Sequence, residues 1–423
     1  MDGTAETRLG GRRLFGVMSA VIFCHLVTLS PCHLVTLRAA DTAAPTFVLQ
    51  TATGKPVRGP LLSLGDKWTT RLSGKAPVEA NADEIIMLHQ ERKPLPPFPT
   101  TTQIIFANGD HVPAGRLKLV GERLHFSPHV GQSKDLTASL SVVSVIWLAS
   151  PDGTDDPVKE RRRLIGQTRT RDVVHLRNGD TLEGVLTGLD ETTVRIEVDK
   201  KAVTVNRAKV AAVALNTELA RPLRPKGPYG RLVMANGCRL SLASAVCSDG
   251  KTLTGVPLFG GEVRVPLRHV AALYLFQGRA VYLSDLKPRK IERVSFLDDS
   301  WPVVADGSAL GLDLRLEGST HDKGLGTHSE CRLTYDLGGG YRRFEAQVGI
   351  DDETQGRGSA RVQVLVDGKP QDLGLDKELT AKNGPLSVRV NLAGAKQLTL
   401  VVGFSKRGNV NGHVDWADAR LIK

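Results

Sequence analysis

The stretch "VVHLRNGDTLEGVLTGLDETTVRI" at residues 173–196 carries the pattern that decides the fold of this 423-residue chain. An alternating apolar strand ends at Asn178-Gly179, and Asn-Gly is the strongest two-residue signal for a β-hairpin because both positions tolerate positive φ. The chain then turns back as a second strand through Gly184, and a third strand follows at 193–198. The stretch therefore predicts a meander of short antiparallel strands.

The same pattern occurs three more times, once in degenerate form. The other copies are "IIFANGDHVPAGRLKLVGERLHF" (104–126), "RLVMANGCRLSLASAVCSDGKTLTG" (231–255) and the degenerate "FVLQTATGKPVRGPLLSLGDKWTTRL" (47–72). Each copy is followed by an apolar run, such as "VAALYLF" (270–276), that predicts a closing fifth strand. Five short strands cannot bury a face as a flat sheet, so we expect each copy to bend into a small barrel. The pattern resembles Sm-like and SH3-like barrels, and the expected repeats span 45–90, 101–150, 171–217 and 229–278.

Proline-rich or charged segments separate the copies. They are "ERKPLPPFPT" (91–100), "SPDGTDDPVKERRRLIGQTRTRD" (150–172) and "ARPLRPKGP" (220–228). Such compositions favour extended or solvated linkers. The triple arginine at 161–163 is a candidate polyanion contact, but no aromatic residues interleave with it to stack bases, so a solvated linker is the favoured interpretation.

The net charge of +11 is unevenly distributed along the chain. Residues 281–423 contain 20 Lys and Arg and 20 Asp and Glu, so the excess positive charge lies upstream. That excess is compatible with a polyanion-binding surface or with an ordinary solvated surface. Aromatic residues make up only 5% of the chain, so Val, Leu and Ala must fill the cores.

The N-terminus has the layout of a secretory signal. Three arginines precede the apolar run "LFGVMSAVIFCHLVTL" (14–29), which is a basic region followed by an apolar region. Cleavage after Ala39 or Ala40 makes 1–40 a signal peptide, and an uncleaved anchor is the alternative. We therefore expect a secreted or periplasmic protein, or one associated with the cell envelope.

Export leaves three cysteines, Cys238, Cys247 and Cys331. Cys238 and Cys247 are candidates for a disulfide across one hairpin, and the sequence leaves this open. No CxxC or HExxH spacing supports a zinc site, so we expect no metal-binding residues of that kind.

The last third of the chain alternates over longer strands. They are "CRLTYDL" (331–337), "RRFEAQVGI" (342–350), "ARVQVLVDGK" (360–369), "LSVRVNL" (386–392), "QLTLVVGF" (397–404) and "HVDWADARLI" (413–422). This spacing predicts a two-sheet antiparallel β-sandwich at 280–423. With the upstream repeats, the predicted fold class is all-β.

Several motifs of this region follow one another in the order of a known family. They are "GLGTHS" (324–329), "RLTYDL" (332–337), "YRRFEAQVGIDD" (341–352), "VQVLVDGK" (362–369) and "HVDWADARL" (413–421). Together they resemble the NPCBM carbohydrate-binding module, which also occurs beside family 98 glycoside hydrolases. The resemblance implies a galactose-binding-like jelly roll and a sugar-binding role. Members of this sandwich class often hold a structural calcium, so calcium is an implied candidate cofactor.

Two loops of the sandwich carry candidate sugar contacts. His328 lies in "HDKGLGTHS" (321–329) and either binds sugar hydroxyls or pairs with Asp415 to tie the first and last strands together. Asp351 and Asp352 end a strand, and carboxylates accept hydrogen bonds from vicinal hydroxyls, bind calcium or cap turns. Successive strand residues point to opposite faces, so these two do not bracket one glycosidic bond as an acid/base pair.

Three further residues complete the candidate set. Arg361 opens the next strand and is a candidate partner of Asp351 or Asp352. Trp416 is a candidate stacking platform for a sugar ring, with burial in the core as the alternative. The predicted carbohydrate-binding residues are His328, Asp351, Asp352, Arg361, Asn411 and Trp416.

These observations favour a secreted, non-catalytic carbohydrate-binding protein. The sequence has no GxSxG elbow, P-loop or Rossmann glycine motif, and repeats of this size leave little room for a deep catalytic pocket. The expected partner is a glycan, either a galactose-like sugar or a polysaccharide. The alternatives are an envelope structural or assembly protein, an accessory subunit of a glycoside hydrolase, and an RNA or polyanion binder. The export signal and scarce aromatics oppose the last, so we expect no nucleic acid partner.

Overall fold

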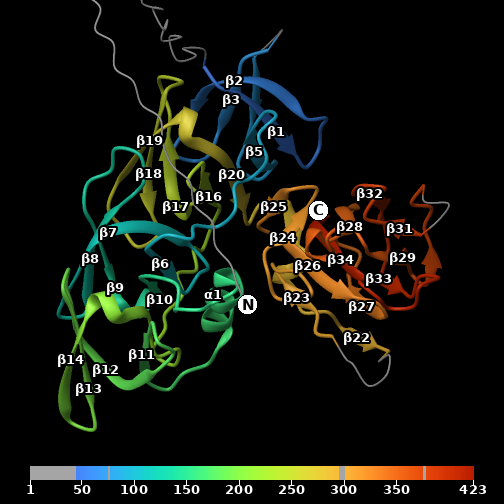
Figure 1. Ribbon diagram of the computed structural model, residues 1–423. Helices are drawn as coiled ribbons and strands as arrows, with labels where there is room; N and C mark the ends of the chain where they lie inside the picture. Colours follow the sequence, from blue (N-terminus) through green and yellow to red (C-terminus); the bar gives the residue numbers. More distant parts are fainter. Residues whose placement is uncertain (1–43, 75–76, 295–300, 375–377) are drawn as a thin grey trace, which may run out of the picture. The chain divides into compact units, whose positions relative to one another are not determined.

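The structure is a computed structural model that describes residues 44–74, 77–294, 301–374 and 378–423. The expected signal peptide at 1–40 lies outside the described residues. Within these ranges the chain is built from antiparallel strands, with a single α-helix, α1 (Pro157–Gly166) (Figure 1). The expectation of an all-β fold is confirmed.

Each of the four repeats forms an antiparallel five-stranded meander in the order 5-1-2-3-4. We name them repeats 1 to 4 in chain order. The strands of repeats 1 and 2 are β1 (Thr46–Thr51), β2 (Val57–Leu64), β3 (Thr70–Leu72), β4 (Val78–Ala80), β5 (Ile85–Gln90), β6 (Gln103–Phe106), β7 (His111–Val120), β8 (Arg123–Pro128), β9 (Leu136–Ser139) and β10 (Val143–Trp147). Those of repeats 3 and 4 are β11 (Asp172–Leu176), β12 (Thr181–Leu189), β13 (Thr193–Val198), β14 (Lys201–Asn206), β15 (Val210–Ala214), β16 (Tyr229–Met234), β17 (Arg239–Val246), β18 (Thr252–Pro257), β19 (Val263–Pro266) and β20 (Val270–Phe276).

The Asn-Gly turns form as the sequence predicts. Gly109, Gly179 and Gly237 have φ values of 84°, 94° and 84°, a region that glycine enters without steric cost. The preceding asparagine accepts a hydrogen bond from the backbone two residues on, as Asn178 Oδ1 does from the Asp180 N–H at 3.2 Å. The turn chemistry therefore fixes the first hairpin of each of these three repeats.

Hydrogen bonding does not close the repeats into barrels, in contrast to the expected closed shape. Among the described residues, no strand pairing joins the fourth strand of a repeat to its fifth strand. The fifth strands pair with each other instead: β10 with β15, and β5 with β20. A strand has only two edges, and each fifth strand uses one for its own repeat and one for a neighbour, so neither edge is left for the fourth strand.

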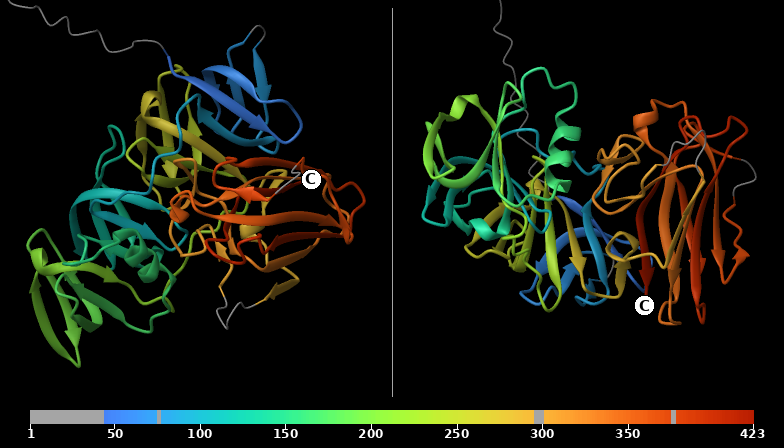
Figure 2. Two further views of the ribbon diagram at one scale, coloured as in Figure 1. Left: turned by 45° about the vertical axis from the view of Figure 1, so that its right-hand side comes forward. Right: turned by 90° about the horizontal axis from the view of Figure 1, so that it is seen from below.

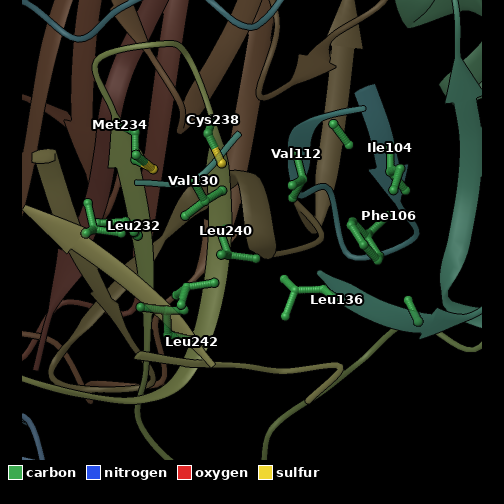
Figure 3. Packing of buried hydrophobic residues seen from close by; sticks show 14 of the residues in the cluster. Ile104, Phe106, Val112, Val130, Leu136, Leu232, Met234, Cys238, Leu240 and Leu242 are labelled. Carbon is green, nitrogen blue, oxygen red and sulfur yellow. The ribbon is translucent and has the colours of Figure 1, made fainter. Parts of the chain in front are cut away.

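The interiors of the repeats join into one hydrophobic cluster. Figure 3 shows Ile104, Phe106 and Val112 of repeat 2 together with Leu232 and Leu240 of repeat 4. These side chains alternate along their strands, as a half-buried sheet requires. The repeats are therefore packed elements and not modules strung on free linkers.

The charged segment at 150–172 is a further difference, because it contains α1 instead of a solvated linker. The Asp156 side chain accepts hydrogen bonds from the backbone N–H groups of Val158 and Lys159, and Pro157 occupies the first turn. Asp followed by Pro is a helix-start signal, which explains the helix.

The triple arginine is engaged in internal contacts. Arg161 is buried and donates to the Pro99 carbonyl at 2.8 Å, while Arg162 donates to Asp313 at 3.0 Å. Arg163 pairs with Glu160 on the same helix at 2.6 Å. These contacts explain the arginines without a polyanion.

The C-terminal region is an antiparallel sandwich of two sheets, as expected (Figure 1 and Figure 2). One sheet has the order β23-β26-β34-β28-β32, with β21 paired to β34, and the other has the order β22-β27-β33-β29-β30, with β31 paired to β29. The strands are β21 (Ala280–Tyr282), β22 (Lys290–Arg293), β23 (Val304–Ala305), β24 (Leu314–Leu316), β25 (Ser319–His321), β26 (Gly324–His328), β27 (Cys331–Asp336), β28 (Arg343–Ile350), β29 (Ser359–Val366), β30 (Lys369–Pro370), β31 (Leu379–Thr380), β32 (Leu386–Asn391), β33 (Gln397–Gly403) and β34 (His413–Ile422). The two sheets enclose a second hydrophobic cluster that includes Phe344, Val348 and Leu400.

A buried ion pair joins repeat 4 to the sandwich. Arg239 of β17 has no solvent exposure, and its Nε and Nη2 donate to the Asp322 carboxylate at 3.1 and 2.8 Å. The other donors of the guanidinium bind the carbonyl oxygens of Pro96, Pro97 and Gly237. All five N–H groups of the arginine therefore have a partner.

The cysteines at the two ends of β17 do not pair. Cys238 directly precedes β17 and Cys247 directly follows it, and both are buried free thiols. Nine residues of strand span about 30 Å, whereas a disulfide needs Cα atoms within about 7 Å. The candidate disulfide is therefore wrong, because the two residues flank one strand and do not face each other across a hairpin. Burial raises the pKa of both thiols.

Candidate functional site

A tight turn at the end of β28 carries three consecutive carboxylates. The turn is a 3-10 helix, η5 (Asp352–Thr354), and the Asp351 side chain begins it by accepting a hydrogen bond from the Glu353 N–H at 2.7 Å. Gln355 and Gly356 then adopt positive φ values of 52° and 77° and reverse the chain toward β29. The sequence "GIDDET" thus ends the strand and turns at the edge of the sandwich.

Two carboxylates of the turn hold the neighbouring hairpin of β24 and β25. Asp351 accepts from the Arg315 N–H at 3.1 Å, and Asp352 accepts from the N–H groups of Glu317 and Gly318 at 3.0 and 2.8 Å. Together they fix the β24–β25 hairpin over η5, because charged acceptors make strong hydrogen bonds to backbone N–H groups.

Glu353 anchors the other side of the turn. Its carboxylate lies 2.7 Å from Nδ1 of His413 and also accepts from the Ser308 hydroxyl. The turn thus ties together the loop at Ser308, the hairpin and the first residue of β34.

A small cavity of about 190 Å³ lies beside η5. It combines carboxylates and a hydroxyl with an apolar surface, which is the mixture that sugar-sized polar ligands need. Asp352 is partly exposed there, with 31% of its side-chain surface accessible. The lining residues are Leu316, Glu317, Ile350, Asp351, Asp352, Gly356, Thr380, Ala381, Gly384 and Pro385.

Of the predicted site residues, the structure brings Asp351 and Asp352 together at this cavity and places the other four elsewhere. Asn411 is half-buried with φ 52°, and its carbonyl oxygen packs against Gly358, where an added Cβ would lie 2.4 Å from it. Arg361 pairs with Glu378 at 3.5 Å. The expected pairing of Arg361 with Asp351 or Asp352 is wrong, because Glu378 is its neighbour instead.

His328 and Trp416 lie in the interior. Trp416 has no solvent exposure and belongs to the core between the sheets, so its ring face is not presented to a sugar. The His328 ring stacks on Trp301 at a centroid distance of 4.6 Å and meets the His413 ring edge-on at 5.0 Å. His328 therefore takes part in an aromatic cluster at the N-terminal end of β34.

The expected pairing of His328 with Asp415 is also wrong. The strand register places His328 opposite His413, and Asp415 opposite Gly326. The side chain beside Asp415 is Asp351, while Nδ1 of His328 lies 2.7 Å from the Ser329 carbonyl. Backbone pairing, and not this side-chain pair, ties β26 to β34.

Asp415 is instead the neighbour of Asp351. Burial raises the pKa of Asp415 well above its ordinary value, and the adjacent Asp351 carboxyl raises it further. Burial also raises the pKa of Asp351, whose oxygens accept from two backbone N–H groups. A neutral Asp415 acid beside an acceptor-only Asp351 is the arrangement that this burial favours.

The sequence interpretation missed Trp301, Ser308, Glu353 and His413. Of these four residues, only Glu353 could have been found from the sequence, because it directly follows the predicted Asp351 and Asp352. The other three come from separate segments, and only the folded register brings them near η5.

No group of three or more His, Cys, Asp and Glu side chains is placed to hold a metal ion in the described ranges. Structural calcium therefore stays a prediction that no such group of ligands supports. Nor does any helix of the described residues have the length and apolar character that crossing a membrane requires.

Comparison with known proteins identifies the C-terminal region. Residues 279–422 match the NPCBM/NEW2 domain, so the resemblance found in the sequence is confirmed. A Renibacterium salmoninarum protein named "Putative endo-alpha-N-acetylgalactosaminidase" is 35% identical over 112 residues, which cover 26% of this chain and 7% of that protein. The chain thus spans only a small part of that relative.

Solved structures include similar sandwich modules. One is "The structure of CBM51 from Clostridium perfringens GH95 in complex with methyl-galactose", 28% identical, covering 34% of this chain and 99% of that one, with a TM-score of 0.31. Another contains tandem CBM51 modules of a family 98 glycoside hydrolase from Streptococcus pneumoniae, 15% identical, covering 76% and 88% of the two chains, with a TM-score of 0.30. The domain match itself supports glycan binding by residues 279–422.

Proposed function

We propose that the chain is a secreted or envelope-associated, non-catalytic glycan-binding protein whose sandwich binds a galactose-like sugar in the cavity beside η5. The observation that carries the proposal is the position of this cavity, with a partly exposed Asp352, inside the region that matches a carbohydrate-binding domain. The proposal includes export through the signal at 1–40.

The chemistry of the cavity suits a sugar ring. Each Asp352 oxygen accepts one backbone N–H, and a carboxylate oxygen can accept a second hydrogen bond. Two vicinal hydroxyls of a sugar could donate these second hydrogen bonds to Asp352. Leu316, Ile350 and Pro385 supply apolar surface for the C–H face of the ring.

The use of the neighbouring carboxylates supports binding over catalysis. Asp351 holds backbone N–H groups, and Glu353 holds Ser308 and His413. A glycosidase needs two carboxyl groups that flank the scissile bond with access to it. The structural engagement of Asp351 and Glu353 therefore argues for a binding role.

The test is titration of methyl galactoside into the full chain, combined with a glycan array to find stronger ligands. Asp352→Ala should abolish binding, while Asp336→Ala, which removes an exposed carboxylate paired with Arg289 on the other sheet, should leave it unchanged. Thermal melts establish that both variants fold. Unchanged affinity in Asp352→Ala removes η5 from the site, and turnover of any bound glycan overturns the non-catalytic role.

A second candidate is an accessory subunit of a glycoside hydrolase. It is favoured by the glycosidase name of the Renibacterium salmoninarum relative, which shares only this module-sized segment. Faster glycan hydrolysis by a partner hydrolase in the presence of the chain, lost in Asp352→Ala, is the result that would select this candidate.

A further inference from the structure

A second cavity, of about 430 Å³, lies between the repeats and the sandwich and shares no residue with the cavity beside η5. Its walls come from β1, β5 and β20 of repeats 1 and 4 and from β25, β28, β32 and β34 of the sandwich. The lining includes the polar and charged residues Lys93, Tyr274, Glu345, Arg389, Asp418 and Arg420.

One wall of this cavity has more positive than negative charge. The single carboxylate of Glu345 accepts from Arg343, Arg389 and Arg420 at 2.7, 2.9 and 2.9 Å. Burial alone would raise the pKa of Glu345, but Arg420 and Arg343 lower it, so the group is a carboxylate at neutral pH. Arg420 also faces the Asp418 carboxylate, so the three guanidinium groups and the two carboxylates leave one positive charge without a counter-charge. Lys93 adds a further cation to the lining.

Two buried polar groups of the same cavity lack a hydrogen-bond partner. The Tyr274 side chain is 1% exposed, and its hydroxyl has no hydrogen-bond partner among the described residues. Asp418 Oδ2 is 2.9 Å from Nδ1 of His321, but Asp418 Oδ1 has no partner in the same ranges. Buried polar groups are nearly always hydrogen-bonded, so Asp418 Oδ1 lacks a donor and the Tyr274 hydroxyl lacks an acceptor.

We propose that this cavity is a second binding site, for a saccharide that carries an anionic group such as a carboxylate or a sulfate. The anionic group would lie against Arg389 and Arg420, because a guanidinium binds planar oxyanions through paired N–H groups. Ring hydroxyls would donate to Asp418 Oδ1 and exchange a hydrogen bond with Tyr274. This site goes beyond the galactose-like sugar proposed for the cavity beside η5.

Calorimetric titration of the full chain tests the proposal with three probes. Galacturonate supplies a carboxylate, galactose 6-sulfate supplies a sulfate, and methyl galactoside is the neutral comparison. Arg389→Gln should weaken binding of the two acidic sugars about tenfold, the effect expected for one charge-assisted hydrogen bond. Tyr274→Phe keeps the ring and removes only the hydroxyl, and it should weaken binding several-fold.

The matched control is Arg289→Gln. Arg289 is 60% exposed and ion-paired on the sandwich, much as Arg389 is 66% exposed and ion-paired, but Arg289 lies outside the cavity. The control should bind the acidic sugars as the unchanged protein does.

Three results would overturn the proposal. They are absence of binding by both acidic sugars at millimolar concentration, equal binding of acidic and neutral sugars at the Arg389 site, and wild-type affinity in both Arg389→Gln and Tyr274→Phe. If Tyr274→Phe melts early, the exposed Arg389→Gln variant decides.

Discussion

Asp322→Ala is expected to destabilise the protein by about 3–5 kcal/mol, the cost of leaving one charge of a buried ion pair without its partner. Arg239 has no solvent exposure, and the Asp322 side chain is 2% exposed, so water cannot replace the carboxylate. The variant removes the acceptor of Nε and of one Nη2 hydrogen, while the carbonyls of Pro96, Pro97 and Gly237 keep the other three donors. The unpaired charge, and not the number of lost contacts, sets the magnitude.

Urea unfolding followed by circular dichroism measures this difference in the free energy of unfolding. The control is Asp336→Ala, which breaks an exposed pair with Arg289 and should cost less than about 1 kcal/mol. Replacing both partners, as Arg239→Met with Asp322→Leu, should recover most of the loss, because the buried charges then disappear together. Equal effects of Asp322→Ala and Asp336→Ala would refute the reasoning, and so would a double variant as unstable as Asp322→Ala.

Three more predictions follow from individual residues. The pKa of Asp415 is raised in the folded state, so the contribution of this group to stability is complete at low pH and is lost as pH rises from about 3.8 through the folded-state pKa. The variant Asp415→Asn stays neutral beside Asp351, so its melting temperature should fall less between pH 4 and 8 than that of the unchanged protein. An unchanged pH profile contradicts this prediction. Gly184→Ala should cost about 1–3 kcal/mol in chemical denaturation, because the added Cβ would lie 2.0 Å from the Glu197 carbonyl oxygen, and a neutral result would show that the strand can shift. Asp156→Ala should cost about 1 kcal/mol by loss of the α1 cap, with Asp156→Asn close to wild type in the same assay.

The hairpins and the sandwich could be predicted because their signals are local. Asn178-Gly179 and its counterparts specify turns, and alternation specifies which side of each strand is buried. The pairing of β10 with β15 and of β5 with β20 could not be predicted, because side-chain periodicity says nothing about which edge meets which. The helix at α1 was missed because its polar composition resembled a linker, although Asp156-Pro157 carried the start signal.

The candidate site was predictable only in part. Asp351 and Asp352 were found because adjacent carboxylates at a strand end are visible in the sequence. Pairings across strands were not predictable, since a register shift of two residues decides whether His328 lies opposite His413 or Asp415. Trp301 was missed for the same reason, because its neighbours are distant along the chain.

The mutual pairing of the fifth strands limits how many repeats this architecture can hold. Each fifth strand is hydrogen-bonded along both of its edges. A pair of repeats joined in this way therefore has no free fifth-strand edge with which another repeat could pair. Lengthening the array by duplication would require a different type of contact, such as the one that β7 and β17 make through His111 and Arg239. Repeats of this type therefore assemble in pairs. They cannot extend into a ring or filament through the fifth strands, because these strands are already paired inside the chain.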